Sequence, residues 1–180
     1  MAKKSKRRAR CFREPVRAYT RTARRVMKRA YIRGVPDPRI RKFDIGNPNG
    51  EYDYEVSLVV TEPGRIRDTS LEAMRVAITR FMDKKAGKNT YYLKVRVYPH
   101  QVLREHSFSG VAGADRLSKG MKRAFGKVVG RAAQVKEGTK IFSIRVKKNH
   151  LELAKQALKR IFSKCTLHTK IEIEELKKDQ

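Results

Sequence analysis

The sequence has few of the residues from which disulfide-bonded and metal-binding scaffolds are built. Its 180 residues include no tryptophan, two cysteines and four histidines. Cys11 and Cys165 are too few for a disulfide framework or a cysteine zinc cluster, so we interpret them as reduced cytosolic thiols. The four histidines have no spacing that builds a metal site. We therefore expect no metal and no other cofactor.

Long apolar runs are also missing. No stretch approaches the ~18 apolar residues of a membrane span, and MAKKSKRRAR at the amino terminus leads into no apolar signal segment. We therefore expect no membrane partner. An Arg-rich amino terminus also fits a mitochondrial transit peptide, although its apolar residues are sparse for one, or a nuclear-localisation signal.

Acidic residues are few relative to basic ones. There are 45 Lys and Arg against 18 Asp and Glu, a net charge of +27, and such a charge requires a polyanionic partner. Residues 1–42 hold 17 of the basic residues and only Glu14 and Asp37, a net +15 that leaves +12 for the rest. Because 39% of the chain is hydrophobic, it can still form one compact core.

The sequence carries no recognisable catalytic constellation. The acidic residues near the first predicted strands form no evident acid/base pair, and we interpret them as a solvated, charge-balancing face. Gly110 and Gly113 precede a predicted helix and could cradle a phosphate, or simply give a loop its freedom. We therefore expect neither enzymatic activity nor a small-molecule substrate. The acidic residues concerned are Asp44, Glu51, Asp53, Glu55 and Glu62.

Periodicity and turn signals predict an α+β fold with a single sandwich-like domain. We expect a basic arm and RNA-binding loop over residues 1–41, whose part 31–40 is extended, and a core over 42–176 with a mobile loop at about 101–116. Thr69 and Glu72 predict a capping box, and Glu152 caps a helix that begins at Asn149. The predicted strands are 43–45, 54–60, 91–98, 128–135, 141–146 and 167–173, and the predicted helices are 69–87, 117–125 and one from 149.

The strand predicted over residues 91–98 has two contrasting faces. Leu93, Val95 and Val97 would face the core, whereas Tyr92, Lys94, Arg96 and Tyr98 would face outward. The outward face fits either a nucleic-acid surface or an ordinary solvated strand face.

Arginine dominates the basic arm, and a second basic cluster follows the predicted mobile loop. The arginine fork binds phosphate bidentately and stacks on unpaired bases, which suits folded RNA. The candidate RNA-binding residues are Arg7, Arg8, Arg10, Arg13, Arg21, Arg24, Arg25, Arg33, Arg39, Arg104, Arg116, Lys119, Arg123, Lys127 and Arg131.

Several ordered motifs resemble one family of ribosomal proteins. They are RARCFRE (8–14), YTR (19–21), YIRGVPDPRI (31–40), FDIGN (43–47), KVRVYPHQVLRE (94–105) and GADRLSKGMKRAFGKVVGRAA (113–133). Together they resemble the large-subunit ribosomal protein family called L-ten-e, equivalent to bacterial L-sixteen, in its archaeal form. The chain departs from that pattern at TARRVMKRA (22–30), at Ile45 where Met is expected, and at HSFSGVA (106–112).

The resemblance implies an α/β-hammerhead-type core bound to large-subunit rRNA, among neighbouring ribosomal proteins in the cytoplasm. It also implies a position close to the A-site tRNA and the peptidyl transferase centre. A transient rRNA-binding assembly factor and an RNA-modifying enzyme are the alternatives. The residues implied to lie in a loop toward the tRNA and the catalytic centre are Gln101, Arg104, Glu105, His106, Ser107, Gly110, Gly113 and Asp115.

Overall fold

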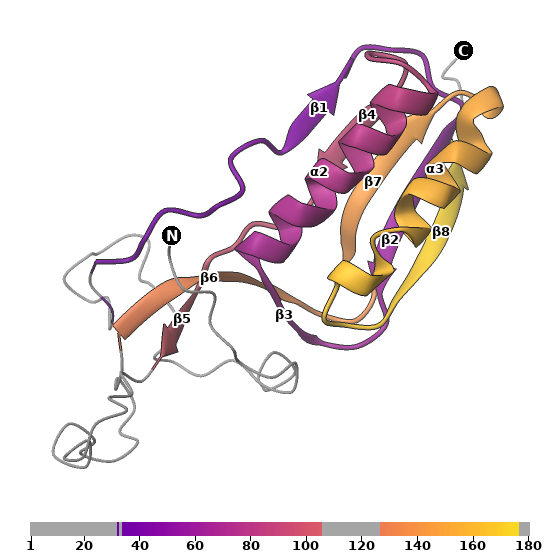
Figure 1. Ribbon diagram of the computed structural model, residues 1–180. Helices are drawn as coiled ribbons and strands as arrows, with labels where there is room; N and C mark the ends of the chain where they lie inside the picture. Colours follow the sequence, from indigo (N-terminus) through magenta and orange to yellow (C-terminus); the bar gives the residue numbers. More distant parts are fainter. Residues whose placement is uncertain (1–31, 33, 106–126, 177–180) are drawn as a thin grey trace, which may run out of the picture.

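The computed structural model describes Ile32 and residues 34–105 and 127–176 (Figure 1). This part of the chain is an α+β structure of two antiparallel sheets, as the sequence predicts. The larger sheet has five strands in the order β1-β4-β7-β2-β8, and the smaller has three in the order β3-β6-β5. Two helices, α2 and α3, cover one face of the larger sheet (Figure 1).

The larger sheet is built around the apolar strand β2, whose Val56, Leu58 and Val60 are fully buried. Strands β7 and β8 both pair antiparallel with β2, so they run parallel to each other with β2 between them. Strands β7 and β8 thus form a strand-crossover-strand unit, and its crossover is α3. The five strands are β1 (Asp44–Gly46), β4 (Tyr92–Val95), β7 (Lys140–Val146), β2 (Tyr54–Val60) and β8 (Thr169–Glu175).

A second split unit overlaps the first. Helix α2 (Asp68–Lys85) lies on the path from β2 to β4, and β7 separates these two strands. Strands β2, β4, β7 and β8 with their two helices therefore follow the β-α-β-β-α-β order of the ferredoxin-like motif. The smaller sheet interrupts this order, because β3 (Gly64–Arg67) precedes α2, and β5 (Gln101–Glu105) and β6 (Lys127–Val135) lie between β4 and β7.

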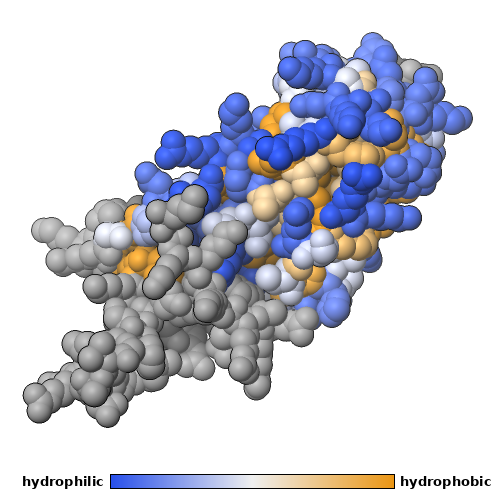
Figure 2. Space-filling view, in the orientation of Figure 1, coloured by the Kyte–Doolittle hydropathy of each residue, from blue (hydrophilic) through white to orange (hydrophobic). Residues whose placement is uncertain are grey.

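Both helices are amphipathic, and their apolar faces cover the core. The apolar residues predicted for the first helix, Leu71, Met74, Ile78, Phe81 and Met82, are all buried. Helix α3 (Leu151–Lys159) lies between two short 3-10 turns, η4 (Lys148–His150) and η5 (Phe162–Lys164). Figure 2 shows mostly hydrophilic side chains on the outside of the helices and apolar ones in the strip between them.

The predicted helix caps are wrong. Helix α2 begins at Asp68, so Thr69 is already helical, and its cap residue Arg67 makes no side-chain capping bond. Asn149 belongs to the 3-10 turn before α3. Glu152 lies in the first turn of α3, where it pairs with Lys155 instead. Neither cap residue, Arg67 for α2 or His150 for α3, makes a side-chain capping hydrogen bond.

The first five residues of the loop predicted at 101–116 form a strand instead. Gln101–Glu105 form β5, which pairs antiparallel with β6, and Gln101, Val102 and Leu103 are buried. The strand predicted over 128–135 is confirmed as β6, and a turn follows it in which Thr139 N–H donates to the Lys136 carbonyl at 3.2 Å. Residues 106–116 and the helix predicted over 117–125 lie outside the described residues.

Candidate nucleic-acid interface

An extended basic segment, residues 34–42, is fastened to the junction of the two sheets. Its backbone is neither helix nor strand, as predicted for this part of the chain. Ile40 is fully buried in the main core. The Arg131 guanidinium, which projects from β6, donates from Nε to the Pro36 carbonyl at 2.6 Å. These contacts hold the segment on a defined path over the surface of the protein.

Asp68 provides the second attachment. This side chain is only 5% exposed, and its Oδ2 accepts a hydrogen bond from the backbone N–H of Arg39 at 3.0 Å. Its Oδ1 accepts from the N–H of Thr69 at 2.7 Å. A carboxylate in the first turn of a helix is also favoured by the helix dipole. Asp68 thus fixes the backbone of Arg39 while the Arg39 side chain remains exposed.

The basic side chains of this segment face solvent. Arg39, Arg41 and Lys42 are all exposed. Arg41 belongs to the arginine-rich arm predicted from the sequence, but neither Arg41 nor Lys42 was among the candidate RNA-binding residues. Asp68 could have been noticed in the sequence, because it lies just before the apolar residues of the predicted helix. Only the structure shows that its carboxylate accepts the Arg39 N–H.

Other predicted site residues lie in the strands of the smaller sheet and not in an exposed loop. Arg104 lies half-buried in β5, and Lys127 is the first residue of β6. Gln101 is only 1% exposed and donates to the Gln134 side chain at 3.2 Å, so it does not belong to an exposed loop. Glu105 is the last residue of β5. The other predicted residues lie outside the described part: Arg7, Arg8, Arg10, Arg13, Arg21, Arg24, Arg25, Arg33, His106, Ser107, Gly110, Gly113, Asp115, Arg116, Lys119 and Arg123.

Two basic parts of the sequence are continuous with the same end of the described body. Glu105 and Lys127 are register partners in the β5–β6 ladder, so the sequence between them leaves and returns at the tip of the smaller sheet. Pro36, close to where the description of the amino-terminal part begins, bonds to Arg131 of the same sheet. Figure 1 shows both attachment points at the same end of the protein. Two basic stretches of sequence therefore join the body at one end.

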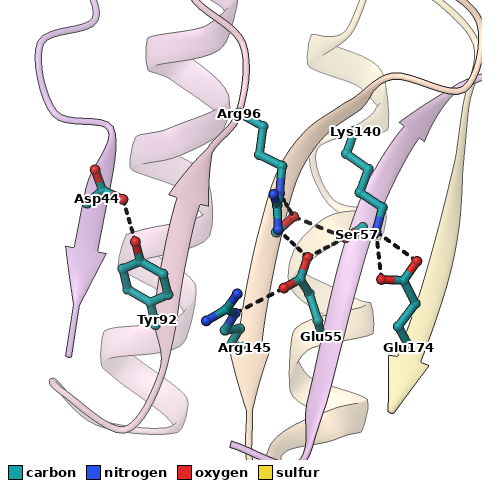
Figure 3. A network of polar contacts seen from close by, with 9 residues as sticks. Asp44, Glu55, Ser57, Tyr92, Arg96, Lys140, Arg145 and Glu174 are labelled. Atoms are coloured by element: carbon teal, nitrogen blue, oxygen red, sulfur yellow. Dashed lines mark hydrogen bonds and ion pairs between the residues drawn. The ribbon is translucent and has the colours of Figure 1, made fainter. Parts of the chain in front are cut away.

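The open face of the larger sheet is different, because its charges are paired within the protein. Glu55 is 3% exposed and accepts from Arg96 Nη2 at 2.5 Å and from Arg145 Nε at 3.0 Å (Figure 3). Arg96 Nε also donates to the Ser143 hydroxyl, which lies 3.1 Å from that of Ser57. The expectation that Glu55 is solvated is wrong: its strand is central, and two arginines compensate the buried charge.

These contacts set the ionisation of Glu55. Burial alone would raise the pKa of the carboxyl, but the hydrogen bond from Arg145 and the charge of Arg96 outweigh it and hold the pKa below the ordinary 4.5. On the same face the Tyr92 hydroxyl donates to Asp44 at 2.5 Å, and Lys140 pairs with Glu174 at 2.6 Å. The outward residues predicted for the 91–98 strand therefore include two, Tyr92 and Arg96, that already have partners within the protein.

No metal site is found within the described ranges 34–105 and 127–176, where no three His, Cys, Asp or Glu side chains lie together. The same part of the chain contains no helix that is long and apolar enough to cross a membrane. The Cys165 thiol has a raised pKa, chiefly because it is buried, so at neutral pH it is not a reactive thiolate.

A small α+β body with two basic segments at one end is typical of proteins that bind polyanions. The family model described as "Ribosomal protein L16p/L10e" matches residues 18–172. The chain therefore belongs to the L16p/L10e family of ribosomal proteins. This confirms the resemblance inferred from the motifs, and membership of this family means a structural component and not an enzyme.

Curated relatives cover almost the whole chain. A protein of Hyperthermus butylicus named "Large ribosomal subunit protein uL16" is 48% identical over 172 residues, which are 92% of this chain and 96% of the relative. Relatives of the same name come from Staphylothermus marinus, 48% identical over 91% of this chain and 94% of its own, and from Archaeoglobus fulgidus, 46% identical over 90% and 93%.

Proposed function

We propose that this protein binds large-subunit rRNA through its basic end, as a structural constituent of the large ribosomal subunit in the cytoplasm. The observation that carries the proposal is the attachment of both basic segments at one end of the body, where Arg131 and Asp68 fix the path of residues 34–42. The family membership and the names of the relatives support it.

The chemistry of binding is electrostatic. Arg39, Arg41 and Lys42 project from a backbone that the body holds in place, so little order has to be gained when they meet phosphates. Arg104 and Arg131 extend this surface along the smaller sheet. Arg131 has a double role, because its Nε is already engaged by Pro36 and only its terminal nitrogens remain for phosphate. Lys127 and the predicted arginines and lysines of 1–33 and 106–126 complete the surface.

The segment after β5 is proposed to reach toward the A-site tRNA and the peptidyl transferase centre. Its ends are held by the Glu105–Lys127 pair at the tip of the smaller sheet, which gives it a fixed origin. The protein then shapes the RNA, and the RNA carries out the chemistry. The core would be of the α/β-hammerhead type, with the paired open face of the larger sheet turned to solvent or to neighbouring ribosomal proteins.

Sedimentation at increasing salt tests the proposal. The tagged full chain is run with cell extract, and the fraction that retains it is quantified. Stoichiometric retention on large subunits at high salt is the expected result, because many phosphate contacts and a fixed fold act together. Release into the free pool at modest salt would contradict it and favour a transient assembly factor.

Paired substitutions test the named end of the molecule. Replacing Arg33 and Arg39 with alanine should weaken binding to large-subunit rRNA and reduce the slope of log affinity against log salt by roughly 0.7 to 0.9 for each lost phosphate contact. The matched control replaces Lys140 and Lys155 with alanine, which removes the same charge from residues that are paired with Glu174 and Glu152. Equal slopes for the two double variants would show that the basic end is not the contact surface.

A further inference from the structure

One exposed aromatic ring lies beside the basic segment. Tyr98 is 49% exposed, the largest value among the exposed large hydrophobic residues in the described part of the chain. Its ring packs on Phe43, with centroids 5.6 Å apart and planes tilted by 30°. Phe43 supports the ring, and about half of the Tyr98 residue stays open to solvent. Tyr98 therefore presents a free aromatic surface on a firm support.

The support is rigid on both sides of Tyr98. Val97 and Pro99 are buried, so the backbone that carries the ring is held in the body. The His100 ring lies within hydrogen-bonding distance of the Tyr98 carbonyl, 2.9 Å from Nδ1. Phe43 is fixed in turn, because its carbonyl accepts from Val95 N–H at 2.8 Å. A ring held in this way loses little freedom when a flat partner stacks on it.

The hydroxyl group of Tyr98 is also open. Tyr52 donates to the Asn47 carbonyl, Tyr91 to Asp83, and Tyr92 to Asp44. Tyr54 bonds to Glu175. Among the tyrosines that the structure describes, Tyr98 alone has a hydroxyl group without a partner. No hydrogen bond of its hydroxyl group to the protein therefore accounts for a tyrosine at this position, and the hydroxyl group can bond to a ligand.

Two cationic residues lie next to Phe43, the residue that supports this ring, in the sequence. Arg41 and Lys42 directly precede Phe43, the residue beneath Tyr98, and both are exposed. An aromatic surface next to long cations is the arrangement that holds a single-stranded nucleotide, by its base and its phosphate together. Fully paired RNA offers no free base face to it. Because Arg41 and Lys42 are positively charged, a basic or a neutral apolar partner fits this surface less well than a nucleotide does.

We propose that Tyr98, supported by Phe43, is a stacking platform for an unpaired nucleobase of the RNA, with Arg41 and Lys42 holding the adjacent phosphates. This inference rests on the proposed function, since it needs the basic end to meet RNA. It adds a base-stacking site to a surface otherwise described by phosphate contacts. The site accepts any base, because every base has an aromatic face.

The test compares three variants of the full chain, Tyr98→Ala, Tyr98→Leu and Tyr98→Phe, by their affinity for large-subunit rRNA. Removing a stacked ring should weaken binding by roughly 5- to 150-fold in the Ala and Leu variants, while Phe retains most of the affinity. The salt slope should stay unchanged, because no phosphate contact is removed. Leucine keeps the bulk without the aromatic face, so equal affinity of the Leu and Phe variants would overturn the proposal.

Phe162 provides the matched control. It is another exposed aromatic residue, 39% exposed, and lies in η5 after α3. Phe162→Ala should leave rRNA affinity unchanged. A second pair of probes, single-stranded oligoadenylate and an RNA duplex of the same length, locates the effect: Tyr98→Ala should weaken binding to the single strand only. Equal losses on both probes, or on neither, would overturn the stacking role.

The two proposals can fail separately. If the unaltered protein binds rRNA with a steep salt slope and all Tyr98 variants bind equally well, only the stacking platform is wrong. If the unaltered protein shows no such binding, the proposed function itself is wrong. Ultraviolet crosslinking of the assembled large subunit adds an independent reading, because a stacked base should crosslink to the peptide that carries Tyr98. Recovery of that peptide without a nucleotide would count against the site.

Discussion

The Asp68 carboxylate joins the backbone of Arg39 to the start of α2. Its two oxygens lie 3.0 Å from the Arg39 nitrogen and 2.7 Å from the Thr69 nitrogen, so both are engaged by backbone donors. The two linked residues are 29 positions apart in the sequence. One buried carboxylate therefore connects the basic segment 34–42 with the helix layer, and the exposure of Arg39 depends on it.

Replacing Asp68 with alanine should lower the free energy of unfolding by roughly 2 to 4 kcal/mol. The change leaves two part-buried backbone N–H groups without their acceptor, and each such loss costs about 1 to 3 kcal/mol, toward the lower end where water reaches the group. The affinity for rRNA should fall as well, because Arg39 loses its fixed backbone. Chemical unfolding and an rRNA binding titration measure the two effects.

Glu72→Ala is the control for that variant. Glu72 lies one turn further along α2 and pairs with the Arg75 guanidinium on the partly exposed side of the helix. An ion pair of this kind contributes only about 0.2 to 1 kcal/mol. If Asp68→Ala and Glu72→Ala destabilised the protein equally, the Asp68–Arg39 connection would have no special role.

Glu55 should make the stability of the domain fall in acid. Its folded-state pKa lies below the ordinary 4.5, so protonation favours the unfolded chain. The stability from this group is complete above the ordinary value and is lost as the pH falls through the lower folded-state pKa. Glu55→Gln should lose about 1 to 3 kcal/mol at neutral pH, less than for a fully buried pair because Arg96 and Arg145 reach solvent. Unfolding titrations from pH 7 to pH 3 measure both.

The comparison for Glu55 is Glu174→Gln on the same sheet face. Glu174 is half exposed and pairs with Lys140, so its contribution is small and screened by salt. The difference in stability between the Glu55→Gln variant and the unaltered protein should shrink below the ordinary carboxyl pKa of 4.5. Glu174→Gln should show little difference at any pH. A constant difference for Glu55→Gln across the titration would contradict the buried ion-pair account.

Shortening the chain within residues 107–113 should spare folding and rRNA binding but slow translation. The segment begins and ends at the paired residues Glu105 and Lys127, and the described residues on either side of it form the main core. Thermal unfolding of the variant and its incorporation into large subunits should match the unaltered protein, while peptide synthesis by those subunits should be reduced. A lower unfolding temperature would show instead that the segment supports the fold.

The sequence predicts those parts of the fold that depend on local periodicity. Leu71, Met74 and Ile78 mark α2 because their spacing alone places them on one face, and the apolar run of β2 is equally clear. Strand β5 was missed because it is held by β6, whose pairing begins more than twenty residues later, and because Pro99 and the Ser- and Gly-containing sequence after it indicate a loop.

The site was predicted only in outline for the same reason. Motifs indicated Arg39 and Arg131 as RNA contacts, but they could not show that Arg131 also holds Pro36. Glu55 was interpreted as solvated because it belongs to a group of acidic residues near the first strands that forms no evident acid/base pair. Its burial follows from Arg96 and Arg145, which reach it from other parts of the chain. Such long-range pairs leave no signal in a single sequence.

Gly46 should not tolerate a side chain. It has φ +92°, and a Cβ at this position would lie 2.0 Å from the Tyr91 carbonyl oxygen, which belongs to backbone and cannot move aside freely. The neighbouring Asn47 N–H donates to that same carbonyl at 3.3 Å, so the close approach is part of the sheet edge. Gly46→Ala should therefore lower the free energy of unfolding by roughly 2 to 4 kcal/mol, or displace β1 from β4.

Gly138 separates the two reasons for this cost. Its φ of +77° is also in the left-handed region, but nothing lies within 4 Å of a Cβ built there. Gly138→Ala should therefore cost only the backbone strain, about 1 to 2 kcal/mol. Because β1 continues directly from the basic segment 34–42, Gly46→Ala should also weaken rRNA binding, whereas Gly138→Ala should not. Equal destabilisation by both variants would show that strain alone, and not the contact with Tyr91, makes glycine necessary at Gly46.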